Sequence, residues 1–369
     1  MPTTTCAAVF NAARQPLEIQ SFPLPELSTG EVLVRITCCT MCGSDLHTYE
    51  GRRTTPTPTV LGHEIMGEIV GFGPGEPARD IGGQPLKAGD RVTWSIAASC
   101  GQCFYCTHGI PQKCEHLFKY GHERIVPDHP LSGGLAEYCH LAPGTAIVLV
   151  PESLPDLVAC PANCATATVA GALRTGGGCE GETVLVQGAG MLGLTACAMA
   201  RSGGAREVLV SDIDPARLAL AERFGASRCV EAGDDGQRLQ AAVEEATDGR
   251  GVDLAIEVSG AASAMQTGLD RLRIGGRYVW VGAVFPAPPL AVSAESVVRG
   301  LLTIRGLHNY VPQDLESAIA FLSREQDRFP FSELVAKTFP LRQANEAVQY
   351  AIEHHPFRIA VRPEALRDS

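Results

Sequence analysis

The chain has no excess of basic residues, no long apolar run and no recognisable export signal. Its 30 lysines and arginines are outnumbered by 41 aspartates and glutamates, so the formal net charge at pH 7 is -11. Because such a chain cannot neutralise a phosphate backbone along an extended surface, we expect no nucleic-acid partner.

The missing apolar run and export signal bear on localisation. The longest weakly polar stretch, residues 157–173, is interrupted by Pro161 and Asn163 and is too broken to cross a bilayer. The first residues lack the basic start and apolar core of a signal peptide. We therefore expect no membrane partner and predict a cytoplasmic protein.

The chain does contain enough apolar sequence for hydrophobic cores, and it is rich in cysteine. Its 369 residues suggest about two domains, and 45% of them are hydrophobic. There are fourteen cysteines. In a long chain without an export signal, clustered cysteines indicate metal binding or free thiols rather than disulfides.

Four cysteines fall within one short window, at Cys100, Cys103, Cys106 and Cys114. Four thiolates suit tetrahedral zinc, and a site closed by four protein ligands is structural. An iron–sulfur cluster is the alternative, but ferredoxin-type runs bring the fourth cysteine closer and follow it with proline, whereas Glu115 follows here. We predict a structural zinc in a lobe spanning about residues 95–118.

A second set of candidate ligands lies earlier, in residues 41–47 and 62–64. Cys42 and His63 offer a thiolate and an imidazole, which zinc prefers over the ligands of magnesium or calcium. The alternatives are a buried thiol and a core histidine. A zinc held by only three side chains keeps an open position, which separates a catalytic site from a structural one.

The run Gly62–Gly67, which reads G-H-E-I-M-G, and Gly73 downstream resemble the signature of the zinc-dependent medium-chain alcohol dehydrogenases. The resemblance covers nearly the whole chain. It implies an α/β protein with a GroES-like β-barrel catalytic domain, residues 1–163 and 307–369. It also implies an NAD-binding Rossmann domain with a doubly wound parallel sheet, residues 164–306.

The same resemblance assigns the third ligand of the catalytic zinc to Cys164, because the family has a threonine four places after that cysteine, here Thr168. Cys160 is close enough to compete, and some relatives use glutamate. Thr168 would then lie near the nicotinamide. With the four-cysteine site, the prediction is two zinc ions per chain.

The resemblance also implies roles for the residues beside these ligands. Ser44 and His47 would pass the alcohol proton to solvent through the cofactor ribose. Their alternatives are a helix N-cap and a loop histidine with a single hydrogen bond. Asp45 would orient His63, and Glu64 would either support the site or bind zinc directly.

The second half opens with a strand pattern at 182–187, a glycine loop and a helical run at 194–201. The loop contains Gly188, Gly190 and Gly193, with Met191 and Leu192 between the last two. The first glycine allows the turn, the second lets the backbone approach a pyrophosphate, and the third lets helix and strand pack closely. We predict a dinucleotide site.

Asp212 ends the next strand, about twenty residues beyond the glycines. A carboxylate there accepts bonds from the ribose hydroxyls and repels a 2′-phosphate, so we predict NAD rather than NADP. Arg217 nearby could tolerate a phosphate, and a helix N-cap is the alternative role of Asp212. By resemblance, Arg358 contacts the cofactor pyrophosphate; a solvated strand charge is the alternative.

The remaining pattern alternates strands and helices. We expect further strands at 6–10, 31–36, 65–72, 90–95, 207–211, 252–258 and 277–282, and helices at 215–224, 237–247, 315–322 and 342–352. Residues 80–87 are expected to form a small loop insertion. Residues 115–135 are expected to form a surface loop near the structural zinc.

The predicted activity is hydride transfer from a small alcohol to NAD. The alternatives are a zinc-independent reductase of the same fold and a non-catalytic zinc or redox-sensing protein. Residues 51–58, 93–95 and 118–123 resemble a subgroup associated with phosphonate catabolism, which implies a hydroxyalkyl phosphonate or a related alcohol. Arg52, Arg53 and Lys119 would meet its anionic group, solvated surface charge being the alternative. Relatives suggest a homodimer or homotetramer.

Overall fold

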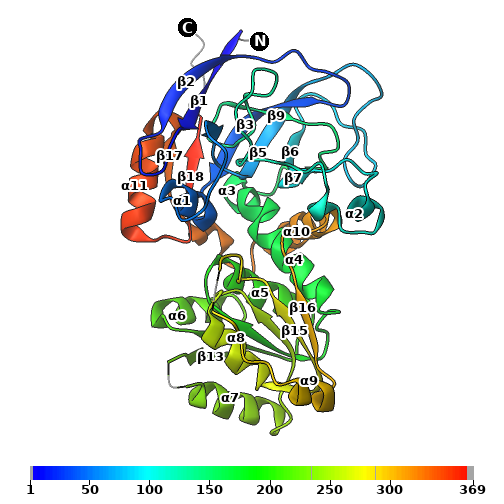
Figure 1. Cartoon of the computed structure of the whole chain (residues 1–369), viewed down its shortest axis with the longest axis vertical. Helices are drawn as coiled ribbons and strands as arrows, with labels where there is room; N and C mark the ends of the chain where they lie inside the picture. Colours follow the sequence, from blue (N-terminus) through cyan, green and yellow to red (C-terminus); the bar gives the residue numbers. More distant parts are fainter. Residues whose placement is uncertain (1–2, 234, 287, 364–369) are drawn as a thin grey trace. The chain divides into compact units, whose positions relative to one another are not determined.

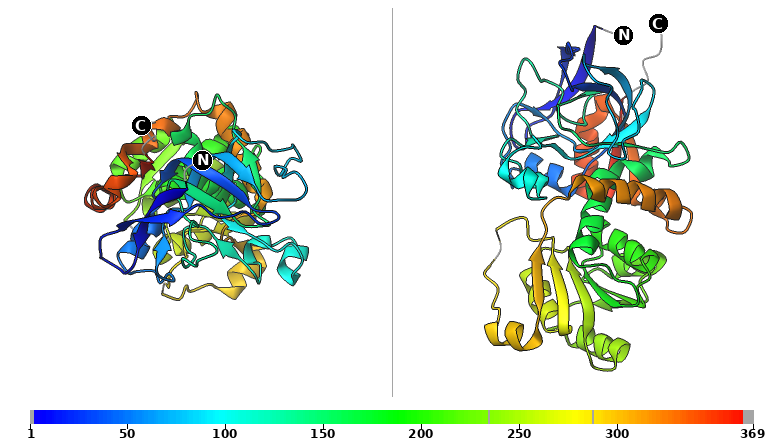
Figure 2. Two further views of the ribbon diagram at one scale, coloured as in Figure 1. Left: turned by 90° about the horizontal axis from the view of Figure 1, so that it is seen from above. Right: turned by 90° about the vertical axis from the view of Figure 1, so that its right-hand side faces the viewer.

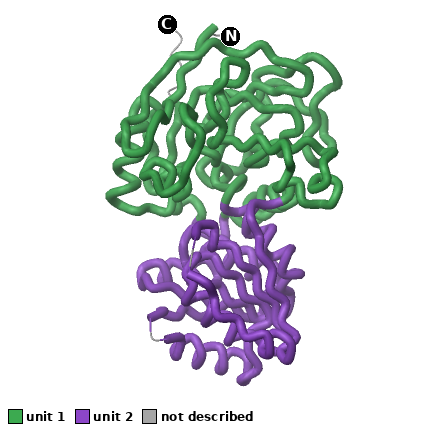
Figure 3. Tube along the Cα trace, in the orientation of Figure 1, with its two compact units in different colours: residues 1–164, 311–326, 331–369 green, residues 165–310, 327–330 purple. Residues whose placement is uncertain are grey.

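The computed structural model describes residues 3–233, 235–286 and 288–363, and these form two compact units (Figure 3). Unit 1 comprises Met1–Cys164, Val311–Gln326 and Phe331–Ser369. Unit 2 comprises Ala165–Tyr310 and Asp327–Pro330. The boundaries expected after residues 163 and 306 lie close to these. The return of residues 327–330 to unit 2 was not expected.

Unit 1 is built on β-strands that follow the runs expected from the sequence (Figure 1). Its described residues contain a seven-stranded sheet, in which β9 pairs with β3 beside the order β10-β6-β5-β3-β18-β17, and a three-stranded sheet of order β2-β1-β4. The strands are β1 (Thr4–Phe10), β2 (Glu18–Pro23), β3 (Val32–Thr40), β4 (Thr59–Val60), β5 (Glu64–Phe72), β6 (Arg91–Trp94), β9 (Tyr138–Leu141), β10 (Ile147–Leu149), β17 (Val335–Pro340) and β18 (Arg358–Arg362).

The strand β3 is central to this sheet and is apolar along most of its length, because both of its faces are covered. Its register places Thr40 opposite Glu64 of β5 and opposite Ala360 of β18. The red C-terminal segments therefore lie among the blue N-terminal strands in Figure 2. This pairing brings the chain's beginning and end together beside the candidate metal ligands.

Short helices and a hairpin complete unit 1. They are α1 (Gly43–Tyr49), α2 (Phe104–Thr107), α3 (Asp156–Ala159), α10 (Pro312–Glu325), α11 (Ala344–His354), the 3-10 helices η1 (Pro111–Lys113), η2 (Cys160–Asn163), η3 (Phe331–Leu334) and η4 (Leu341–Gln343), and the paired strands β7 (Ala97–Ala98) and β8 (Phe118–Lys119). The expected helices at 315–322 and 342–352 correspond to α10 and α11.

The prediction of a surface loop for residues 115–135 is wrong for part of that segment. Tyr120 and Leu131 are fully buried. The Tyr120 ring packs edge-on against Trp94 and Phe118, with ring centroids 6.1 and 5.3 Å away. Aromatic burial of this kind holds the segment in the core of unit 1.

Unit 2 is a doubly wound α/β unit. Among its described residues, six parallel strands lie in the order β13-β12-β11-β14-β15-β16. The order reverses between β11 and β14, which is where such sheets bind ligands. The elements are α4 (Ala165–Thr175), β11 (Thr183–Gln187), α5 (Met191–Ser202), β12 (Glu207–Asp212), α6 (Pro215–Arg223), β13 (Arg228–Glu231), α7 (Gln237–Thr247), β14 (Val252–Glu257), α8 (Ala262–Leu269), β15 (Leu272–Trp280), α9 (Ala294–Gly300) and β16 (Thr303–Gly306).

Within residues 3–233, 235–286 and 288–363, no helix has the length and apolar character needed to cross a membrane.

Candidate active site

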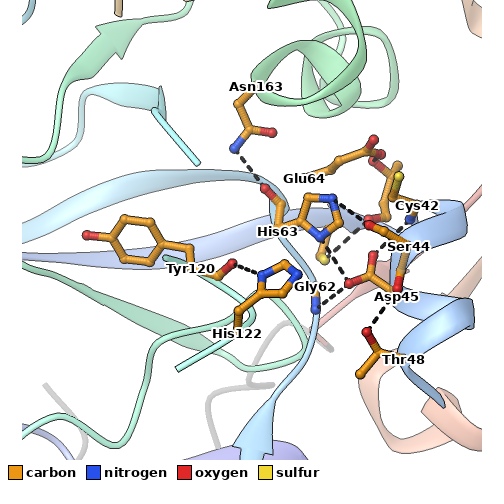
Figure 4. A network of polar contacts seen from close by, with 12 residues as sticks. Cys42, Ser44, Asp45, Thr48, Gly62, His63, Glu64, Tyr120, His122 and Asn163 are labelled. Atoms are coloured by element: carbon orange, nitrogen blue, oxygen red, sulfur yellow. Dashed lines mark hydrogen bonds and ion pairs between the residues drawn. The ribbon is translucent and has the colours of Figure 1, made fainter. Parts of the chain in front are cut away.

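Four side chains of unit 1 converge at the end of β3, with their ligand atoms all within 4.8 Å of one another. They are Cys42, His63, Glu64 and Cys164. Cys42 is the N-cap of α1, His63 directly precedes β5, and Cys164 follows η2. Figure 4 shows Cys42, His63 and Glu64 turned toward one another. Two sulfurs, an imidazole and a carboxylate form a donor set that fits zinc.

The His63 ring is held by Asp45. Asp45 Oδ1 lies 3.0 Å from His63 Nδ1, and both side chains are almost completely buried (Figure 4). Since a carboxylate accepts, Nδ1 carries a proton, which leaves Nε2 as the nitrogen that a metal would take. Burial lowers the pKa of His63, but Asp45 and the Cys42 sulfur outweigh burial and raise it to about 10. Asp45 Oδ2 also accepts from the Cys42 backbone N–H at 2.9 Å. Asp45 thus contacts His63, as the resemblance implied, and also the backbone of Cys42, which was not expected.

The thiols of Cys42 and Cys164 are hydrogen-bonded to each other. The hydrogen bond from Cys164 lowers the pKa of Cys42 well below its usual value, and the Arg358 guanidinium, 3.6 Å from the Cys42 sulfur, lowers it further. The same contact raises the pKa of Cys164. A divalent cation would replace the proton of this hydrogen bond, since metal binding and thiol deprotonation are linked.

Glu64 is held away from solvent by Arg358. Arg358 donates to Glu64 Oε1 at 2.6 Å and to Oε2 at 2.7 Å, and Thr40 Oγ1 donates to Oε2 at 2.6 Å. Burial raises the pKa of Glu64, and Arg358 opposes that increase. Arg358 is only 5% exposed, so its alternative role as a solvated strand charge is wrong.

Cys160, the alternative to Cys164 as third ligand of the catalytic zinc, makes contacts outside this group of ligand atoms. Its sulfur lies 3.3 Å from the carbonyl oxygen of Cys38 and 3.2 Å from that of Glu64. Burial raises its pKa well above the usual value, so it remains a thiol. The structure therefore brings Cys164, rather than Cys160, to Cys42 and His63.

Ser44 and His47 both lie on α1, three residues apart and hence on one side of the helix. Ser44 Oγ is 3.4 Å from His63 Nε2. Cys42, rather than Ser44, occupies the N-cap position, so the N-cap alternative for Ser44 is wrong. The hydroxyl thus lies beside the ligand nitrogen.

His122 is a site residue that the sequence analysis missed. Its ring packs against His63 with a centroid distance of 5.3 Å, and its Nδ1 donates to the Tyr120 carbonyl oxygen at 2.8 Å (Figure 4). Burial lowers the pKa of His122 well below its usual value. The run 118–123 was singled out only for its subgroup resemblance, and no local pattern predicts a contact between His122 and His63, which lie about sixty residues apart.

The second cysteine cluster also fits zinc. The sulfurs of Cys100, Cys103, Cys106 and Cys114 all lie within 4.8 Å of one another. Backbone N–H groups of Glu115 and Cys106 lower the pKa of Cys103 to about 6. The Cys114 sulfur accepts from the backbone N–H groups of Cys100 and His116, each at 3.3 Å. These amides support thiolates, as around a structural zinc.

The glycine loop in unit 2 joins β11 to α5. Gly188 has φ +100°, in the region that favours glycine, and a Cβ on Gly193 would lie 1.7 Å from the Gly188 carbonyl oxygen. Gly190 is the N-cap of α5, and a Cβ there would meet nothing within 4 Å. Met191 and Leu192 form the first turn of that helix. This open, positively polarised helix end fits a pyrophosphate.

Asp212 lies beside this loop at the end of β12. Its Oδ2 accepts from the Ala189 backbone N–H at 2.5 Å, and its Oδ1 accepts from the Asp214 N–H at 2.9 Å. Asp214, not Asp212, caps α6, so the N-cap alternative for Asp212 is wrong. Arg217 pairs with Asp214 at 3.5 Å. Thr168 lies on α4, in the same unit.

Models of two protein families match the chain. The alcohol dehydrogenase GroES-like domain matches residues 28–152, and the zinc-binding dehydrogenase family matches residues 192–324. The first match includes Cys42, His63 and the Cys100–Cys114 cluster but not Cys164, and the second begins in the first turn of α5. Each match thus falls within one of the two units, apart from the helix α10.

Similar proteins span nearly the whole chain. The 5-exo-hydroxycamphor dehydrogenase of Pseudomonas putida is 30% identical over 338 residues, covering 90% of this chain and 92% of that protein. The L-threonine 3-dehydrogenase of Alteromonas mediterranea is 31% identical over 333 residues, covering 89% and 91%. The structure of an alcohol dehydrogenase from Thermotoga maritima is 30% identical, with a TM-score of 0.92 and coverage of 98% and 100%. The chain belongs to the zinc-dependent medium-chain alcohol dehydrogenase family.

Proposed function

We propose that this dehydrogenase uses a catalytic zinc and NAD to oxidise a small alcohol that carries an anionic group. The observation that carries the zinc chemistry is the convergence of Cys42, His63 and Cys164, with Asp45 fixing the imidazole. When bound there, zinc supplies a Lewis acid that favours loss of the alcohol proton. NAD supplies the hydride acceptor.

The chain's own residues handle the proton. Ser44 accepts it beside His63, and His47 passes it on toward solvent, since imidazole exchanges protons readily near neutral pH. Glu64 stays paired with Arg358 and keeps a negative charge next to the thiolates. The cluster at Cys100–Cys114 holds the second zinc and orders a segment that buries little apolar surface.

Asp212 supports NAD over NADP. Its carboxylate lies next to the glycine loop, bonded to Ala189, where a ribose 2′-phosphate would meet a negative charge. Arg217, the residue that could favour a phosphate, already pairs with Asp214. Thr168 and Arg358 remain proposed contacts of the nicotinamide and the pyrophosphate.

Lys119 and Arg53 are the side chains that would contact the anionic group of the substrate. Burial and the charge of Arg53 together lower the pKa of Lys119 to about 8, although the thiols of Cys164 and Cys42 partly oppose the shift. Among the described residues, neither cation has an acidic partner within ion-pair distance. Two neighbouring cations without a counter-ion favour an anionic ligand.

Arg52 contributes less to this proposal than the sequence suggested. It pairs with Glu50 at 3.4 Å, and 64% of its side chain is exposed. Its charge is therefore solvated, and we assign the anionic group to Lys119 and Arg53 alone. A hydroxyalkyl phosphonate, implied by the subgroup resemblance, is our candidate substrate.

The test is NADH formation with pairs of alcohols, each neutral alcohol matched with its phosphonate-bearing analogue. Turnover that stops with a zinc chelator and favours the phosphonate supports the whole proposal. Turnover that favours the neutral alcohols discards the anionic group and keeps the dehydrogenase. Absence of turnover on every pair argues for the non-catalytic zinc or redox-sensing alternative.

A further inference from the structure

In the described part of the chain, a further group of metal-ligating side chains lies outside both cysteine clusters. One ligand atom from each of Glu31, His129 and His140 lies within 4.8 Å of the other two. Glu31 directly precedes β3, and His140 lies on β9, opposite Leu33 of β3. His129 lies in the segment between β8 and β9. The fold thus brings three separate stretches of unit 1 to one point.

His140 is the least satisfied member of this group. It is 1% exposed, and among the described residues neither of its ring nitrogens has a hydrogen-bond partner. Its Nε2 lies 2.9 Å from Glu31 Oε2, close enough for an ion pair but not aligned as a hydrogen bond. A buried polar atom without a hydrogen bond costs free energy, so its position requires an explanation.

A metal ion bound by both side chains would explain why His140 Nε2 and Glu31 Oε2 lie close together without an aligned hydrogen bond. With metal–ligand distances of about 2.0–2.2 Å, two ligands of one ion lie about 3.0 Å apart at the right angle of square-planar or octahedral coordination and about 3.4 Å apart at the tetrahedral angle. Two ligands of one ion direct their lone pairs at the ion rather than at each other. The close but unaligned Glu31 and His140 have this relationship.

His129 is prepared for the same role. Its Nε2 lies 2.9 Å from the His140 carbonyl oxygen, and because a carbonyl only accepts, Nε2 carries the proton. Its Nδ1 therefore keeps a lone pair, the arrangement typical of a metal-ligating histidine. The His129 and His140 rings are stacked at 4.0 Å with an interplanar angle of 19°.

We propose that Glu31, His129 and His140 form a third metal site, for a divalent ion of the zinc, nickel and copper class. Two imidazoles and one carboxylate are the ligands this class takes. Glu31 is anchored by accepting from the Ser28 backbone N–H at 2.7 Å. The ion would tie the segment before β9 to the start of β3, and this role is independent of the proposed reaction.

The test counts zinc bound per chain after equilibrium dialysis against buffered free zinc, using the wild-type protein and single variants. We expect the wild type to bind one equivalent more than His140→Gln or Glu31→Gln, both of which retain the two cysteine sites. His354→Gln, which alters an exposed histidine of α11, is the matched control and keeps the full amount. A wild type that saturates at two equivalents, or a His140→Gln protein that binds as much as the wild type, overturns the proposal.

A second measurement covers variants that fold poorly. With both cysteine sites loaded, added nickel should raise the melting temperature of the wild type, because a ligand that binds only the folded state stabilises it. The increase should be absent in His129→Gln and present in His354→Gln. An equal increase in all three proteins, or none in the wild type, contradicts the site.

Discussion

Arg358 and Glu64, 294 residues apart in the sequence, form an ion pair in which the guanidinium donates to both carboxylate oxygens. The same guanidinium lies 3.6 Å from the Cys42 sulfur. The pair exists because β18 and β5 flank β3 in the same sheet. Arg358 is 5% exposed and Glu64 is fully buried. A buried charge that loses its partner is costly, so this contact links the closing strand of unit 1 to the stability of the metal site.

Arg358→Ala should therefore destabilise the protein by about 3–5 kcal/mol, because it leaves the Glu64 carboxylate buried and unpaired. Arg362→Ala is the control on the same strand, since Arg362 pairs with Asp156 at 3.4 Å with a side chain that is 43% exposed. That change should cost about 1 kcal/mol or less. Denaturant titration of both variants measures the difference, and equal losses would contradict the buried pair.

Asp45→Asn should weaken zinc binding at the Cys42 site by about 10–100-fold, because the amide no longer fixes the His63 tautomer. The rate of zinc release to a chelator measures this. Asp128→Asn, at an exposed position, should release zinc like the wild type. Wild-type release from the Asp45→Asn protein would show that Asp45 does not orient the ligand.

The affinity for an anionic substrate should change with pH as the Lys119 ammonium group loses its proton, because the pKa of Lys119 is lowered to about 8. Below about pH 8 the ammonium is charged and attracts an anionic substrate; as the pH rises through about 8 it loses its proton and the attraction falls. The KM of an anionic alcohol should therefore rise above pH 8, while that of a neutral alcohol should not. Lys119→Met should remove this pH-dependent step, and a step that persists in the variant would assign it to another group.

Alanine substitutions at two glycines of the loop should have different effects, one on the stability of the protein and the other on its affinity for NADH. Gly193→Ala should lower the melting temperature, since its Cβ would clash with the Gly188 carbonyl oxygen at 1.7 Å. Gly190→Ala meets open space in the protein, so it should fold normally and bind NADH more weakly. Normal NADH affinity in the Gly190→Ala protein would place the pyrophosphate elsewhere.

The sequence predicted many of the elements and the Cys100–Cys114 cluster because those signals are local, whereas Cys164 was assigned through the family resemblance. Periodicity located α7 at Gln237–Thr247, and spacing identified Cys100 to Cys114 as one group. The expected structural roles of Gly188 and Gly193 agree with the backbone around them.

Contacts made through tertiary packing could not be predicted in this way. His122 packs on His63, and Tyr120 is buried against Trp94, although the sequence around both is typical of a loop. Glu31 meets His140 only because β3 and β9 are neighbours. Strand order decides such contacts, and no local pattern encodes it.

The most direct test of the proposed chemistry compares Cys164→Ala with Cys160→Ala, measuring zinc content and NADH formation on the same samples. We predict that Cys160→Ala keeps its zinc and its turnover. Cys164→Ala should keep the zinc of the Cys100–Cys114 cluster, lose the zinc held by Cys42 and His63, and form no NADH. A Cys164→Ala protein with wild-type zinc content and turnover would contradict the catalytic zinc site described here.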